Sequence, residues 1–210
     1  MSELRKRGRP KREIFDIEGH AFFITFSCYH RLPLLGRDRC KRIVLGQMDV
    51  LSRRHGVGVV GYVIMPDHLH ALVRPVRSGL LSLFMQQWKR LTSATIQTFL
   101  GLGTERDSTP FGARTRDSSG KIHVWQKRYY PFNVYTPKKA VEKLAYMHNN
   151  PVRAGLVVDP CAWPWSTAAH FLLGKPCPVN LCPMDGPILF VSPREQAARK
   201  GRLNVALRPR

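Results

Sequence analysis

Two histidines, His68 and His70, stand one residue apart in the apolar segment YVIMPDHLHALVRP, residues 62–75. The turn chemistry of Met-Pro-Asp at 65–67 within this segment predicts a β-hairpin. Side chains two residues apart on a strand point to the same face, so the two imidazoles can reach one ion. Neutral imidazole binds divalent metals, and two histidines leave coordination positions open. The pair therefore predicts a candidate metal site, although paired histidines also occur at ordinary surfaces.

A second set of candidate residues lies on a predicted helix. The segment KKAVEKLAYMHNN, residues 138–150, has apolar side chains at helical spacing, and Thr136 with Pro137 provides the start signals of a helix. Pro151 disfavours helical backbone at Asn150, where we expect the helix to end. The stripe expected to face the core consists of Val141, Leu144, Ala145 and His148.

Tyr146 lies well off that stripe, and Asn150 shares its side if the helix still holds there. A large aromatic side chain that points away from the core is either an ordinary exposed tyrosine or a hydroxyl presented to a substrate. The spacing alone leaves both interpretations open. The combination of a basic protein, a polar pair able to bind metal and a tyrosine on a separate element favours the second.

The charge balance indicates what kind of partner the chain binds. Its 210 residues include 34 Lys plus Arg against 14 Asp plus Glu, a formal net charge of +20. Such a field attracts polyanions, and nucleic acid is the first candidate, with a merely basic surface as the alternative. Within the basic stretch 1–18, Arg7 and Arg9 of RGRP resemble the core of an AT-hook that enters a narrow minor groove. A basic arm that touches phosphates without preference is an equally open interpretation.

Several classes of protein are disfavoured. No run approaches 18 apolar residues, and no apolar stretch follows the N-terminal charges, so we expect neither a membrane span nor a signal peptide. A cytoplasmic, nucleoid-associated protein is the expectation. The 5 cysteines are odd in number and lack C-x-x-C spacing, which argues against a disulfide framework and a structural zinc site.

The elements that position these residues alternate along the chain. Periodicity predicts strands at 20–29, 57–65, 68–75 and 121–136, the last broken by Pro131, helices at 37–56, 80–100 and 138–150, and a loop at 101–120. The order β-α-β-β-α-β predicts a ferredoxin-like α+β fold, an antiparallel sheet with helices packed mainly on one face. We expect a flexible basic arm at 1–18, one domain at 19–174 and a Pro-rich basic tail at 175–210.

Ordered motifs within that domain resemble a known family. MPDHLHALV resembles the histidine-hydrophobe-histidine (HUH) motif of single-tyrosine transposases of bacterial insertion sequences. LAYMHNNPVRAGLV, with WQKRYYPFNVYT before it and WPWS after it, is similar to the REP-associated tyrosine transposases, which are IS200-like. The resemblance covers residues 20–173. It implies a ferredoxin-like protein that binds single-stranded DNA bearing a hairpin, and that cuts and rejoins the strand without a nucleotide cofactor.

The resemblance also implies a role for each motif residue. His68 and His70 become metal ligands, Asn150 matches a third, polar ligand, and Tyr146 becomes the nucleophile. A phenol titrates near ~10, so its attack on a phosphodiester needs help at neutral pH. Mg²⁺ or Mn²⁺ would supply that help by offsetting the developing charge. The product would be a 5′-phosphotyrosine and a free 3′-hydroxyl, and a second 3′-hydroxyl could reverse the step.

Basic and aromatic residues supply candidate DNA contacts. The residues expected to hold phosphates are Lys89, Arg90, Lys127 and Arg128, and those expected to stack on bases are Trp125, Tyr129 or Tyr130. Each has an alternative, solvated helix charge for the first two and core packing for Trp125. Pro131 departs from the family pattern, which commonly has an acidic residue after the aromatic pair, and this puts full activity in doubt.

Three functions remain compatible with the sequence. The leading one is a metal-dependent DNA transesterase. The second is a hairpin-binding protein that no longer cuts, and the third is a phosphodiesterase that uses water with Tyr146 as a bystander. The sequence leaves open whether the protein is a monomer or a homodimer, and whether the tyrosine serves its own histidine pair or that of a second copy.

Overall fold

The computed structural model describes residues 20–105, 107 and 109–183. Arg7 and Arg9 lie outside these ranges, so their predicted DNA contacts stay predictions. The described residues include the first part of the expected tail, residues 175–183. This part packs on the domain. The backbone N–H of Cys182 donates to the carbonyl of Val59 at 2.7 Å, and Val179 is buried in the core. The packed part of the chain therefore continues past residue 174.

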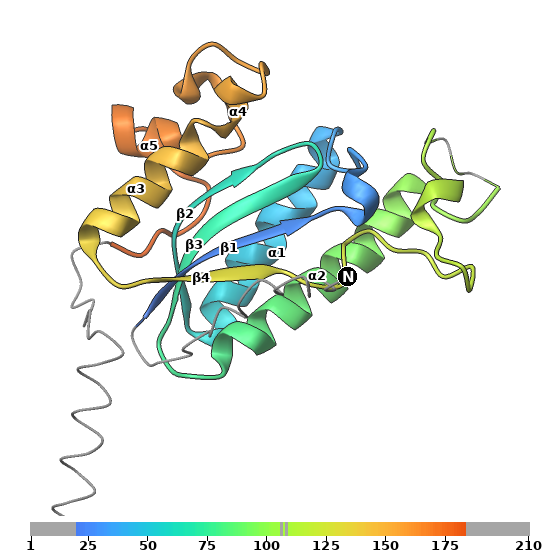
Figure 1. Ribbon diagram of the computed structural model, residues 1–210, viewed down its shortest axis with the longest axis horizontal. Coiled ribbons are helices and arrows are strands. Elements are labelled where there is room, and N and C mark those ends of the chain that lie inside the picture. Colours follow the sequence, from blue (N-terminus) through green and yellow to red (C-terminus); the bar gives the residue numbers. More distant parts are fainter. Residues whose placement is uncertain (1–19, 106, 108, 184–210) are drawn as a thin grey trace, which may run out of the picture.

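Four strands form one antiparallel sheet in the order β2-β3-β1-β4 (Figure 1). They are β1 (Ala21–Ser27), β2 (Val57–Ile64), β3 (His68–Pro75) and β4 (Tyr130–Val134). β1 and β3 are central, and β2 and β4 are the edges. With a long helix after β1 and another after β3, this topology confirms the predicted ferredoxin-like α+β class.

The two long helices, α1 (Asp38–His55) and α2 (Leu80–Leu100), cover one face of the sheet (Figure 1). The structure confirms both of these helices, which the sequence predicts at 37–56 and 80–100. α1 ends at Gly56, whose φ of 62° lies in the left-handed region that glycine reaches without strain. Trp88 is fully buried between the helices and donates from Nε1 to the Val44 carbonyl at 2.9 Å. The strand residues of this core layer are Phe22, Ile24 and Phe26 of β1, Val57, Val59, Tyr62 and Ile64 of β2, and Leu69, Ala71 and Val73 of β3.

A third helix, α3 (Pro137–His148), packs on the opposite face (Figure 1). Thr136 caps it as predicted, accepting a hydrogen bond from the Lys139 backbone N–H at 3.1 Å. The predicted core stripe is wrong in two of its members, because Val141 is 54% exposed and Ala145 is also exposed. The helix is turned so that Ala140, Leu144, Met147 and His148 meet the sheet.

Short elements complete the described part of the chain. They are the 3-10 turns η1 (Tyr29–Arg31), η2 (Ala113–Thr115) and η3 (Pro160–Ala162) and the helices α4 (Asn150–Arg153) and α5 (Ala168–Leu173). The expectation that Pro151 holds Asn150 out of helix is wrong, because Asn150 begins α4 with the proline in its first turn. A proline is well tolerated there, since its missing N–H would have had no intrahelical partner.

The last strand begins later than predicted. Within residues 121–129, Trp125 forms only an isolated antiparallel bridge to Cys28, and the regular pairing with β1 is made by Tyr130–Val134. Pro131 lies inside this strand, where its missing N–H is tolerated because β4 is an edge. Its register partner is Ile24, which belongs to the core under α1 and α2. Directly opposed residues share a face, so position 131 faces away from the side that carries α3.

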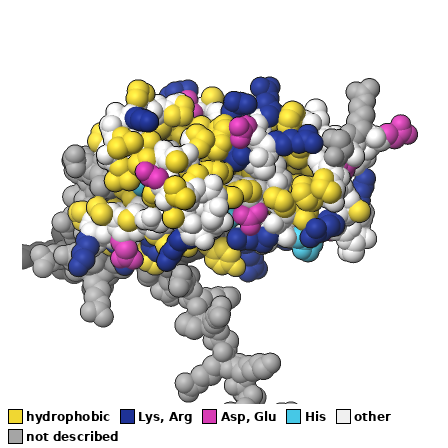
Figure 2. All heavy atoms as spheres, turned by 90° about the horizontal axis from the view of Figure 1, so that it is seen from above, with side chains coloured by type: hydrophobic (Ala, Val, Ile, Leu, Met, Phe, Trp, Pro, Cys, Tyr) yellow, Lys and Arg dark blue, Asp and Glu magenta, His cyan; other side chains and the backbone are white. Residues whose placement is uncertain are grey.

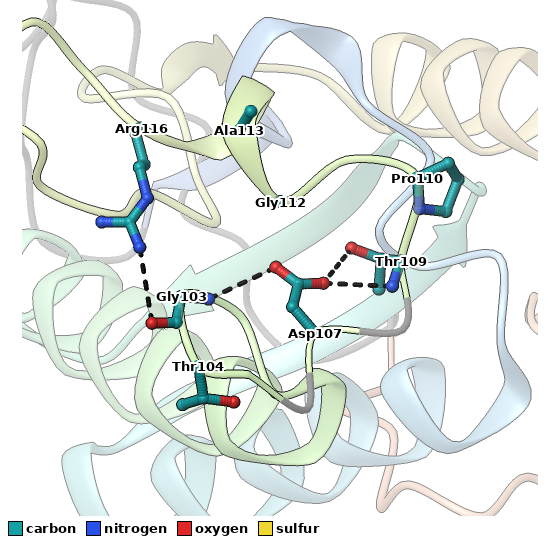
Figure 3. A pocket seen from close by; sticks show the side chains of 8 residues that line it. All are labelled: Gly103, Thr104, Asp107, Thr109, Pro110, Gly112, Ala113 and Arg116. Carbon is teal, nitrogen blue, oxygen red and sulfur yellow. Dashed lines mark hydrogen bonds between the residues drawn. The ribbon is translucent and has the colours of Figure 1, made fainter.

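The loop after α2 is organised by hydrogen bonds to two aspartates. Asp107 accepts from the backbone N–H of Gly103 and from the N–H and hydroxyl of Thr109 (Figure 3). Asp117 accepts hydrogen bonds from the backbone N–H and hydroxyl of Ser119, from the backbone N–H of Lys121 and from Nε2 of His123. This loop borders an open hollow of about 520 Å³, whose lining includes Asp107 and Arg116 (Figure 3). Arg116 donates a hydrogen bond to the Gly103 carbonyl.

Candidate active site

His68 and His70 begin β3 and point to the α3 side of the sheet, as their spacing predicts. Their rings lie 5.0 Å apart, centroid to centroid. His68 Nδ1 is 2.6 Å from an Asp67 carboxylate oxygen, and His70 Nδ1 is 2.7 Å from the Thr25 hydroxyl. Among the described residues, neither Nε2 atom has a hydrogen-bonding partner. The two rings are therefore held by one nitrogen each, and the other nitrogen is left to bind a ligand.

Asp67 and Arg31 form a chain of contacts behind His68. Arg31 Nε lies 2.9 Å from the second Asp67 oxygen, and its Nη1 donates to the Ser27 hydroxyl at 3.1 Å. Burial opposes ionisation of Asp67, but the hydrogen bond from His68 and the charges of His68 and Arg31 hold the pKa of this carboxyl below its usual range. An ionised Asp67 accepts a hydrogen bond from the Nδ1–H of His68, and in this tautomer of the neutral ring the lone pair lies on Nε2.

The turn that carries Arg31 is strained. His30 and Arg31 have φ values of 49° and 57°, the positive-φ positions of the described chain that are not glycine. Such conformations cost of order 1 kcal/mol or more each and persist where the surroundings hold them. The Arg31–Asp67 ion pair is one such restraint, so the strain lies beside the candidate site.

His70 is the more enclosed of the two histidines, at 5% exposure. Its ring stacks on Phe23 with centroids 5.3 Å apart. Burial lowers the pKa of His70 to about 3, and the charges of His68, Arg31 and Lys143 act in the same direction. His70 is therefore neutral near pH 7, the form in which imidazole binds metal.

Tyr146 comes to this pair from α3. Its ring centroid is 5.6 Å from that of His70 and 6.1 Å from that of Phe23, and 42% of the residue is exposed. Two cations flank the ring, with Lys143 Nζ 5.8 Å and Arg153 Cζ 5.6 Å from its centroid. No acidic side chain of the described residues forms an ion pair with either cation. The tyrosine is thus half-exposed, beside a histidine and in a locally positive environment.

Asn150 lies one helical turn beyond Tyr146. Its side-chain amide donates to the Tyr146 carbonyl at 3.3 Å, which leaves its side-chain oxygen available as an acceptor. Asn149, between α3 and α4, keeps right-handed helical backbone with φ −81° and ψ −7°, so Asn150 stays one turn from the tyrosine even though the first helix ends at His148. The structure brings His70 together with His68 and with Tyr146, and it holds Asn150 against the backbone of Tyr146.

The donor set fits a divalent ion bound by mixed ligands. Two imidazole nitrogens and one amide oxygen suit Mn²⁺ well and Mg²⁺ less well, because Mg²⁺ favours oxygen. No group of three or more His, Cys, Asp or Glu side chains able to hold a metal occurs in the part of the chain that the structure describes. A site of this kind has few negative charges of its own.

The predicted DNA contacts on the other side of the sheet have different surroundings. Trp125 is 5% exposed, packs edge-on against Phe26 and donates to the Thr92 hydroxyl at 3.0 Å. The expectation that Trp125 stacks on bases is therefore wrong, and its core-packing alternative holds. Lys89 Nζ donates to the carbonyls of Gln126 and Lys127 at 2.6 and 3.0 Å. Its ammonium ties α2 to the loop that carries Trp125.

Other predicted contacts remain open to solvent. Arg90, Lys127 and Arg128 are exposed, so their phosphate contacts stay predictions. In Figure 2, Lys and Arg side chains lie around the outline of the molecule, with hydrophobic side chains over much of the area between them. All five cysteines are unpaired in the structure. Within the described ranges, no helix has the length and hydropathy to cross a membrane.

Four residues around the site were not found from the sequence: Thr25, Asp67, Lys143 and Arg153. Asp67 precedes the first histidine, where its residue type and the preceding proline indicate only a turn. Lys143 and Arg153 stand three before and seven after Tyr146, so helical spacing alone places the lysine near its ring. Thr25 carries no such signal, because its contact with His70 depends on the register of β1 against β3.

Comparison with known proteins bears on the fold. No protein-family model matches the chain. A solved REP-associated tyrosine transposase, bound to a REP hairpin in its structure, superposes with a TM-score of 0.57 at 20% identity. The match covers 89% of this chain and 91% of the other. This chain has the fold of a REP-associated tyrosine transposase. The resemblance predicted from the motifs is confirmed at the level of the fold.

A second relative comes from a sequence comparison. An uncharacterized protein of Haemophilus influenzae is 24% identical over 161 residues, which are 70% of this chain and 88% of that protein. Because that protein is uncharacterized, this similarity does not indicate a function.

Proposed function

We propose that this protein is a transposase of the HUH type, a metal-dependent endonuclease and strand transferase that acts on single-stranded DNA with a hairpin. The observation that carries the proposal is the approach of Tyr146 to His70, 5.6 Å between ring centroids, beside two histidines that each keep Nε2 available. The fold shared with a REP-associated tyrosine transposase supports it. The net charge of +20 suits a polyanionic substrate.

In this proposal the side chains divide the work between binding and attack. Lys143 and Arg153 hold the scissile phosphate against Tyr146, because both cations flank its ring and lack an acidic partner among the described residues. His68, His70 and Asn150 would hold Mn²⁺ or Mg²⁺. When bound, such an ion offsets negative charge that develops on the phosphoryl oxygens.

The chemical step is a transesterification. The Tyr146 oxygen forms a bond to phosphorus as it loses its proton, and the bond from phosphorus to the 3′-oxygen breaks as that oxygen takes up a proton. A 5′-phosphotyrosine and a 3′-hydroxyl result. One phosphodiester replaces another, so a second 3′-hydroxyl can attack the phosphotyrosine in the reverse sense. Rejoining therefore needs no nucleotide cofactor.

Covalent trapping tests the proposal. Purified protein is mixed with Mn²⁺ or Mg²⁺ and labelled single strands that contain imperfect hairpins, and a denaturing gel is examined for protein-linked label. A labelled band that disappears in Tyr146→Phe and with chelator is the expected result. Cleavage that survives Tyr146→Phe would show a phosphodiesterase that uses water. Tight binding without an adduct in either metal would show a hairpin-binding protein that does not cut.

The structure also bears on which histidine pair the tyrosine serves. Tyr146 and His70 approach each other within one chain, so we propose that the tyrosine acts in cis. Mixing His70→Ala with Tyr146→Phe should then restore no adduct, whereas a shared site in a homodimer would restore part of it. Pro131 is not expected to impair activity, since that position faces away from the histidine pair.

A further inference from the structure

The side of the sheet that carries the histidines is only partly covered by α3. One row of residues crosses all four strands on this side, because Val63 pairs with His70, His70 with Thr25, and Thr25 with Tyr130. Directly opposed residues on paired strands point to the same face. Val63 is buried under α3, whereas Tyr130 at the other end of the row is 75% exposed. The row therefore runs from core to solvent through the candidate site.

Tyr130 is the most exposed aromatic side chain of the described residues. It starts the edge strand β4, and its neighbour on the same face, Phe132, is half-buried against the core under α3. Lys143 Nζ lies 4.5 Å from the Phe132 ring centroid. An exposed aromatic ring on a sheet, in the same row as His70, resembles the way sheet aromatics receive unpaired bases in single-strand-binding domains.

The position of this ring agrees with a strand that passes over the site. Neighbouring strands lie ~4.8 Å apart, so the Tyr130 backbone is roughly 10 Å from that of His70, across β1. A phosphate held at the histidines would have its neighbouring nucleotide over Thr25 and Tyr130. Lys127 and Arg128, exposed just before β4, provide positive charge for the phosphates beyond.

We infer that Tyr130 is a binding residue that stacks on an unpaired base next to the scissile phosphate. This inference rests on the proposed function for the direction of the strand, but the stacking itself requires no cleavage. The occupant is single-stranded DNA, because the exposed Lys127 and Arg128 precede the ring by three and two residues and bring positive charge to this end of β4. A π-face is common to all bases, so Tyr130 contributes affinity and placement without selecting a particular base.

Binding measured in chelator separates this inference from cleavage. The probe is a fluorescently labelled DNA hairpin with single-stranded thymidine flanks, compared with the same hairpin with abasic flanks and with a blunt one. Tyr130→Ala should weaken binding of the thymidine-flanked hairpin roughly five- to hundredfold, which is the range for loss of one stacked base. Tyr130→Phe should bind like the unmodified protein, because the ring rather than the hydroxyl stacks.

Controls decide between stacking and a general loss of structure. Phe99→Ala removes an aromatic ring that is 42% exposed on α2, on the other side of the sheet, and should leave binding unchanged. On the abasic and blunt hairpins, Tyr130→Ala should equal the unmodified protein. Equal losses on all three probes, or no loss on any, would overturn the inference. If the stacking pattern holds while no protein forms an adduct in Mn²⁺, only the proposed cleavage fails.

Discussion

The two faces of the sheet use the same strands for different purposes. The face under α1 and α2, the closed face, is mostly apolar at its buried positions, with Asn133 opposite Phe22 as a buried polar residue, and Trp88 packs over it. The face under α3 is apolar at one end and carries Thr25, His68 and His70 at the other. Because successive strand residues alternate between faces, β1 and β3 can stabilise the fold with one set and present polar groups with the other.

The comparison teaches that stability and chemistry are separated by face. If so, substitutions on the closed face should change the free energy of unfolding, and substitutions around the histidines should change metal or DNA binding while the fold persists.

The largest effect is expected on the closed face. Trp88→Ala removes a fully buried side chain and its hydrogen bond to the Val44 carbonyl. The free energy of unfolding should fall by about 3–5 kcal/mol, the usual cost of truncating a buried aromatic residue. Urea denaturation measures this loss. A loss of unfolding free energy below about 1 kcal/mol would contradict tight packing of the core on this face.

An intermediate effect is expected behind the first histidine. Asp67→Ala removes the acceptor that orients His68, and Mn²⁺ affinity should fall about 10- to 100-fold, as for other partners of metal-binding histidines. Titration followed by the electron paramagnetic resonance of free Mn²⁺ measures the affinity without reference to cleavage.

Asp67→Asn is the matched control for this prediction. The amide oxygen can still accept from His68 Nδ1, so part of the Mn²⁺ affinity should return. Equal Mn²⁺ affinity in Asp67→Ala and the unmodified protein would show that Asp67 belongs only to the turn.

The smallest effect is expected at the cations beside the tyrosine. Lys143→Gln and Arg153→Gln should each weaken strand binding a few-fold and reduce the salt slope of binding by about 1, as expected for one lost phosphate contact. Fluorescence anisotropy over a salt series measures both. Arg54→Gln, an exposed residue of α1 on the closed side, is the control and should change the slope less. Equal changes in all three would indicate a diffuse positive field instead of a defined phosphate site.

Local signals explain which parts of the structure were predictable. Gly56 ends α1 and Thr136 begins α3 because their chemistry acts within a few residues. The shared face of His68 and His70 follows from strand alternation alone. The rotation of α3 was predicted only in part, since Val141 and Ala145 are as suitable for a core as Ala140 and Met147. Packing against the sheet, rather than the helix's own sequence pattern, determines which of these residues are buried.

Trp125 illustrates the limit for single residues. An aromatic residue followed by Lys127 and Arg128 is typical of a nucleic-acid contact, yet its ring packs against Phe26. The cause is a contact distant in sequence, because Lys89 on α2 holds the loop with hydrogen bonds to two carbonyls. Nothing in the local sequence around Trp125 predicts that restraint.

The sequence by itself determined the order of elements, the paired histidines on one face, the tyrosine on a separate helix and the strong positive charge. These follow from spacing and residue type, which act locally or sum over the chain. The tertiary structure alone decided that Tyr146 meets His70, that Asp67 and Thr25 hold the two rings, and that Tyr130 lies exposed in the same row. Those relations depend on strand register and on how α3 crosses the sheet, and both are set by packing between segments far apart in the chain.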